Sequence, residues 1–171
     1  RAVYLVGIHD LRQQRRAENE LEKLVAELRA TLESTADGIL VSDLSGDIRN
    51  YNRHFAKLWN VPQDLLLNRN DQALYAHLAS QVSDAEGYQQ RLQEIEDNPL
   101  LNATDILVLV SGCVLERVTR TQYSRGHPTG RVFCFRDITQ HLMQQSHLKL
   151  AAKVFESSLE AIFITSPDFL I

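Results

Sequence analysis

The sequence contains few cysteines and no long apolar run. Only two of its 171 residues are cysteines, Cys113 and Cys134, and neither belongs to a CxxC pair. Both lie in apolar stretches, which argues against a disulfide framework or zinc site and favours buried thiols in a reducing compartment. No apolar run approaches the roughly 18 residues of a membrane helix, and the N-terminus lacks a secretion signal pattern. We expect a cytoplasmic chain without direct membrane contact, although a parent protein could be anchored elsewhere.

An excess of basic residues is also missing. The 18 Lys and Arg residues are outnumbered by 22 Asp and Glu residues, so the net charge at pH 7 is −4. Nucleic-acid-binding proteins carry clustered positive charge, so nucleic acid is not an expected partner. The hydrophobic fraction of 44% is sufficient for a globular core.

Recognisable catalytic motifs are absent as well. The chain has no Gly-rich phosphate loop, no HExxH, and no Ser or Cys nucleophile with a histidine at motif spacing. Its six histidines are scattered along the chain. We therefore predict no catalytic residues and no metal site in this fragment.

The most informative feature that is present is an internal repeat. Residues 32–48 align without gaps with residues 155–171, and residues 4–11 align with residues 131–138. Such a repeat indicates tandem copies of one unit. We expect residues 1–11 to be the C-terminal strand of a preceding repeat and residues 36–139 to be one complete domain. Helical connectors then occupy residues 12–35 and 140–159, and residues 160–171 form the first strand of a following repeat.

The two connectors carry apolar residues at helical spacing. Residues three and four apart share one face of a helix, which predicts an amphipathic helix in each connector. Two alternatives follow: each stripe packs on its own domain, or it pairs with a second chain as a coiled coil. We expect a homodimer seam formed by Leu21, Leu24, Leu28, Leu32, Leu148, Ala152, Phe155 and Leu159.

Between the connectors the pattern alternates between short strands and short helices. GILVSD and IRNYN flank an LSGD turn, which indicates a hairpin. Helical patterns cover residues 52–59, 71–81 and 84–97, and Pro62 opens another short helix. Three strands follow at residues 104–110, 113–122 and 131–138, with RGHPTG as a longer loop. This order predicts an α+β fold with a five-stranded antiparallel sheet and short helices on one face.

The element order and several strings resemble the PAS family. YNRHFAKLWNVPQDLL, DILVLVSGCVLERVTR and GRVFCFRDIT look like the PAS and PAC halves of bacterial sensors in which PAS repeats precede GGDEF or EAL domains. The resemblance implies a sensory and relay module whose partners are its own second copy, neighbouring PAS repeats and a downstream domain of the same chain. That output would be cyclic di-GMP synthesis or breakdown. A sensor histidine kinase parent and a spacer that binds no ligand are the alternatives.

The resemblance also implies roles for single residues. Asn52 would cap the first helix after the hairpin, and Trp59 would fill the junction between helix and sheet. Asp137 and Thr139 would form the hinge where the last strand becomes the output helix, although Asp137 could equally be a simple helix-start anion. Glu116 could pair with Arg136 across adjacent strands, or both side chains could be solvated.

An apolar cavity between sheet and helices is the expected ligand pocket. It could hold a small molecule or be filled by its own side chains. Haem is disfavoured because His77, the one histidine on an internal helix, lacks the surrounding haem-sensor motif. Flavin adduct chemistry is disfavoured because no predicted helix of the core contains a cysteine. The expected pocket residues are Ile39, Val41, Phe55, Trp59, Leu78, Tyr88, Leu92 and Ile106.

Overall fold

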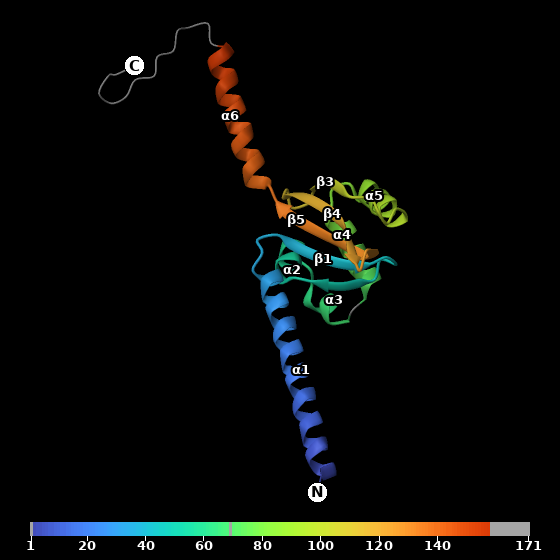
Figure 1. The fold of residues 1–171 in the computed structure, drawn as a ribbon. Helices are drawn as coiled ribbons and strands as arrows, with labels where there is room; N and C mark the ends of the chain where they lie inside the picture. Colours follow the sequence, from blue (N-terminus) through green and yellow to red (C-terminus); the bar gives the residue numbers. More distant parts are fainter. Residues whose placement is uncertain (1, 69, 158–171) are drawn as a thin grey trace, which may run out of the picture.

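The computed structural model describes residues 2–68 and 70–157, which form a five-stranded sheet, a set of short helices and two long terminal helices (Figure 1). The strands are β1 (Gly38–Asp43), β2 (Ile48–Tyr51), β3 (Ala103–Val108), β4 (Val114–Ser124) and β5 (His127–Asp137). The helices are α1 (Ala2–Glu33), α2 (Arg53–Leu58), α3 (Gln63–Asn68), α4 (Asp71–Gln81), α5 (Ala85–Asp97) and α6 (Thr139–Ser157). The predicted α+β class is confirmed.

The sheet has the order β2-β1-β5-β4-β3, and all neighbouring strands are antiparallel. The first and last strands, β1 and β5, are therefore neighbours near its centre, with Gly38 opposite Phe135. This adjacency places the end of α1 and the start of α6 at the same end of the sheet. Figure 1 shows the two long helices leaving the domain in opposite directions.

The core lies between one face of the sheet and helices α2, α4 and α5. Successive strand residues point to opposite faces, so every second residue of β4 and β5 enters this layer. Leu115, Phe133 and Phe135 do so, and Phe55 and Trp59 from the α2 region meet them there. The face of the sheet that packs against the helices is called the inner face below.

A two-residue turn joins β4 to β5. Arg125 and Gly126 both have positive φ, 50° and 82°, and they connect β4 to β5 with Ser124 opposite His127. Positive φ at both central residues is typical of tight hairpins. The RGHPTG segment is therefore mostly strand, and the prediction of a longer loop there was wrong.

The N-terminal segment also differs from expectation. Residues 2–11 belong to α1, so the prediction of a strand for residues 1–11 was wrong for the residues described. A strand needs a partner to satisfy its backbone N–H and C=O groups, whereas a helix satisfies them internally. The five described strands offer these residues no pairing. The strand expected at residues 160–171 lies outside the described residues.

Candidate functional site

Asn52 ties the end of α1 to the domain, in an arrangement called the N-terminal joint below. This side chain is 1% exposed. Its Oδ1 accepts hydrogen bonds from the backbone N–H of Ile39 (2.8 Å) and of Phe55 (2.9 Å). Its Nδ2 donates to the carbonyl oxygens of Leu32 (3.0 Å) and Asp37 (2.9 Å). Asn52 thus caps α2, as predicted, and also holds the last turn of α1 and the start of β1.

Asp137 and Thr139 form the C-terminal joint, where β5 becomes α6. The Asp137 carboxylate accepts hydrogen bonds from the backbone N–H (2.9 Å) and the hydroxyl (2.5 Å) of Thr139. These hydrogen bonds lower the pKa of Asp137. The Thr139 hydroxyl oxygen in turn accepts from the Val114 N–H (2.8 Å), which fastens the joint to β4. Asp137 therefore acts at this joint as an anion that organises the first turn of α6.

An ion pair links the two joints. Arg136 donates two hydrogen bonds to Asp37, at 3.0 and 2.9 Å, through its Nε and Nη2. Asp37 lies between α1 and β1, whereas Arg136 immediately precedes the C-terminal joint. The carboxylate raises the pKa of Arg136. Glu116 stands opposite Arg136 in the strand register, but the guanidinium binds Asp37 instead.

Trp59 fills the junction between helix and sheet, as the family resemblance implied. It is fully buried and packs edge-on against Phe135, with ring centroids 5.2 Å apart. Its ring also lies beside Phe55 (6.5 Å) and Tyr88 (6.3 Å). Together with Leu78, these residues occupy the layer in which the ligand pocket was expected.

Other members of the predicted pocket lie elsewhere. Ile106 is 56% exposed and points to the outer face of the sheet, so its assignment to an interior pocket was wrong. Ile39 and Val41 also face outward, because Leu40 between them enters the core and neighbours on a strand alternate. Leu92 is half-buried against the core. The predicted set of eight is therefore divided between the two faces.

A buried ionic cluster on the inner face was not anticipated. Arg117 of β4 is 1% exposed and donates to Asp105 of β3 at 2.8 Å. Arg91 of α5 donates to the other carboxylate oxygen at 2.8 Å. Burial favours a higher pKa for Asp105, but the hydrogen bonds from Arg117 and Arg91 prevail and lower it. The Arg117 guanidinium also lies 5.5 Å from the centre of the Tyr88 ring, and burial raises the pKa of Tyr88 to about 12.

Three buried polar atoms have no hydrogen-bond partner among the described residues. They are Trp59 Nε1, Arg117 Nη1 and Thr119 Oγ1. Arg117 and Thr119 share the inner face of β4, and both Trp59 and Arg117 contact Tyr88. A buried donor of this kind ordinarily meets protein, water or ligand.

The predicted dimer seam is partly described. Leu21, Leu24 and Leu28 are 57–67% exposed on α1, and Leu148 is 71% exposed on α6. Leu32 is only half exposed, because it lies at the N-terminal joint. Ala152 and Phe155 belong to α6, but their side chains are not described, and Leu159 lies outside the described residues.

The arrangement of these parts defines a class of protein. A five-stranded antiparallel sheet with order β2-β1-β5-β4-β3 carries helices on one face, and a long terminal helix adjoins each of the two central strands β1 and β5. The PAS fold family matches residues 26–138, so the chain belongs to the PAS family. Comparison with curated proteins gives no match.

Solved structures share this fold. The PAS domain of an HTR-like protein from Haloarcula marismortui is 22% identical, with a TM-score of 0.51, and the match covers 72% of this chain and 99% of that one. The PAS domain of BvgS from Bordetella pertussis is 15% identical, with a TM-score of 0.50, and the match covers 75% and 98%. None of the helices in the described part of the chain is both long and apolar enough to cross a membrane.

Proposed function

We propose that this PAS domain relays a signal between its two terminal helices within a homodimer. The observation that carries the proposal is the ion pair between Asp37 and Arg136, which joins the N-terminal and C-terminal joints. A displacement of α1 acts on Asp37 through the Asn52 hydrogen bonds. Arg136 is adjacent in sequence to Asp137, so the same displacement reaches the first turn of α6.

Exposed leucines on both long helices support the dimer. Leu21, Leu24 and Leu28 form a largely exposed stripe on α1, and large apolar residues are more often covered than left in water. Pairing with the same stripe of a second copy would bury them in a coiled coil. The same reasoning applies to Leu148 on α6.

Sedimentation velocity at micromolar concentration tests the dimer directly. We expect the chain to sediment as a dimer and the variant with Leu24→Glu and Leu28→Glu to sediment as a monomer. A control with Arg16→Glu and Lys23→Glu, roughly on the other side of α1, should remain dimeric. A wild-type chain that is entirely monomeric would contradict the proposal.

We further propose that the downstream output is synthesis or breakdown of cyclic di-GMP. The support is the similarity of three strings in this chain to PAS and PAC segments that precede GGDEF and EAL domains. Reading the gene downstream of the codons for these 171 residues tests the assignment. GGDEF or EAL strings are expected there, and the phosphoacceptor and ATP-binding motifs of a histidine kinase would refute the cyclic di-GMP output while leaving the relay intact.

A further inference from the structure

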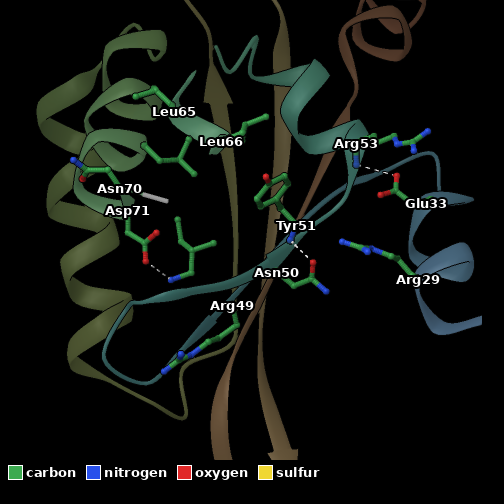
Figure 2. Close-up of a pocket in the computed structure, with 12 residues that line it drawn as sticks. Arg29, Glu33, Arg49, Asn50, Tyr51, Arg53, Leu65, Leu66, Asn70 and Asp71 are labelled. Atoms are coloured by element: carbon green, nitrogen blue, oxygen red, sulfur yellow. Dashed lines mark hydrogen bonds between the residues drawn. The ribbon is translucent and has the colours of Figure 1, made fainter. Parts of the chain in front are cut away.

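A cavity lies at the edge of the core, where α1 meets the domain. It has a volume of about 580 Å³, within the range of small-molecule sites. Figure 2 shows it between the end of α1 and helices α3 and α4, with Tyr51 of β2 between them. It is lined by Arg29, Glu33, Ile48, Arg49, Asn50, Tyr51, Arg53, Leu65, Leu66, Asn70, Asp71 and Leu74. This cavity is called the α1 pocket below.

The side-chain acceptors of the α1 pocket are already engaged by backbone N–H groups. Glu33 accepts from the Arg53 N–H at 3.0 Å, and Asp71 accepts from the Ile48 N–H at 2.8 Å. The Asn50 Oδ1 accepts from the Tyr51 N–H at 2.9 Å, and the Asn70 Oδ1 accepts from the Ala73 N–H at 3.0 Å. Each of these four side chains thus has one oxygen engaged in holding the fold.

The donors of the same pocket are mostly free. Arg49 is paired with Asp43. By contrast, the guanidinium groups of Arg29 and Arg53 and the hydroxyl of Tyr51 make no hydrogen bond or ion pair with any described residue. Figure 2 shows Arg29 reaching from α1 towards Asn50 and Tyr51. The pocket therefore offers two unpaired guanidinium groups and a hydroxyl to a ligand, which favours a ligand with an anionic acceptor group.

The apolar and acidic residues that line the α1 pocket restrict the size and charge of an anion that could bind there. One wall of the pocket is apolar, and a bare inorganic ion has no apolar surface to bury against it. This wall consists of Ile48, Leu65, Leu66 and Leu74. Glu33 and Asp71 also line the pocket, and their negative charge disfavours a dianion such as a phosphate monoester. A carboxylate carries one charge and matches the planar fork of an arginine.

We propose that the α1 pocket binds a small carboxylate with an apolar body. Its carboxylate accepts hydrogen bonds from Arg29, and its body packs against the leucines of α3 and α4. Such a ligand bridges α1 to β2 and α3, so its binding fixes α1 on the domain beside the N-terminal joint. The lining of the α1 pocket includes none of Trp59, Leu78 and Tyr88, which occupy the layer between sheet and helices.

Octanoate and its neutral isostere octanamide test the proposal on the 171-residue chain, with affinities taken from amide chemical shifts in NMR titrations. Octanoate is expected to saturate with shifts centred on Arg29, Tyr51 and Leu65, and octanamide is expected to bind at least tenfold more weakly. Arg29→Gln should weaken octanoate about tenfold, because a hydrogen bond to a charged group is lost, and should leave octanamide unchanged.

Arg15→Gln, the same substitution in an exposed part of α1, is the matched control and should bind octanoate like the wild type. Equal binding of octanoate and octanamide would overturn the proposal, as would an unaffected Arg29→Gln variant. Shifts centred on Trp59 and Tyr88 would place the ligand in the core instead and would also overturn it. Absence of any saturable octanoate binding would do the same.

Discussion

Replacing Asp105 with asparagine should destabilise the domain strongly, because it leaves the charge of Arg117 buried and unpaired. Asp105 is the only ion-pair partner of Arg117 in the described chain, and one nitrogen of that guanidinium already lacks a hydrogen-bond partner. Removing one member of a buried ion pair costs about 3–5 kcal/mol, a large share of a total stability of about 5–15 kcal/mol. Tyr88 contributes an aromatic face to the guanidinium but no countercharge.

Urea unfolding followed by tryptophan fluorescence measures this loss, because Trp59 is the one tryptophan and is fully buried. Glu94→Gln is the matched control: Glu94 also pairs with Arg91, but it is about half exposed, and its loss should cost less than about 1 kcal/mol. The double variant Asp105→Leu with Arg117→Met removes both charges and should recover most of the lost stability.

The pH dependence follows from the lowered pKa of Asp105. A carboxylate whose pKa is lower in the folded state stabilises the protein above its unfolded pKa of about 3.9. That contribution disappears as the pH falls through the folded value. The difference in unfolding free energy between wild type and Asp105→Asn should thus be constant from pH 7 to about pH 5 and shrink below pH 4. A loss under about 1 kcal/mol at pH 7, or a double variant as unstable as Asp105→Asn, would refute the reasoning.

Three further predictions concern the joints and the sheet. Asn52→Ala should lower the unfolding free energy by about 3 kcal/mol in urea titrations, since it removes a helix cap and leaves buried backbone groups unpaired, whereas the exposed Asn50→Ala should cost less than about 1 kcal/mol. Gly130→Ala should lower the melting temperature more than Gly112→Ala, because the added Cβ would lie 2.2 Å from the Ser42 carbonyl oxygen, whereas at Gly112 it has open space and only the positive φ of 85° opposes an alanine. Inserting two residues after His147 rotates the rest of α6 by about 200° and should uncouple output from input in the parent protein, whereas seven residues nearly restore the phase and should preserve regulation. If both insertion variants keep the regulation of the wild type, α6 is a passive tether and the relay mechanism is wrong.

Local signals in the sequence were sufficient to predict most of the helices and strands between the two terminal helices. Asn52 before an amphipathic segment predicts the start of α2, and the Ser-Gly pair within LSGD predicts the first hairpin, because each depends on residues close in sequence. The orientation of β1 could not be predicted in the same way. GILV is apolar without alternation, so its sequence does not reveal that Leu40 faces the core and Ile39 faces outward.

Features that depend on contacts between residues far apart in the sequence could not be predicted from it. Arg117 is a charged residue in a strand, which is ordinarily solvated, and its burial follows from Asp105 on the neighbouring strand and Arg91 on α5. One signal was present: Leu115, Arg117 and Thr119 alternate with Glu116 and Val118, so Arg117 shares a face with an apolar residue. The α1 pocket could not be predicted because it needs five elements, and its unused donors become visible only when the partners of each acceptor are known.

The adjacency of β1 and β5 has a consequence for how such chains grow over evolutionary time. Gly38 stands opposite Phe135, so the polypeptide enters and leaves the sheet through neighbouring strands. A gene duplication that copies the segment from α1 to β5 therefore adds a complete domain to the chain. It neither interrupts the existing sheet nor changes which of its strands are paired. Each new domain is inserted between two helical segments at a single point. A protein can thus gain further domains of this kind one at a time, and each added domain can acquire its own ligand specificity.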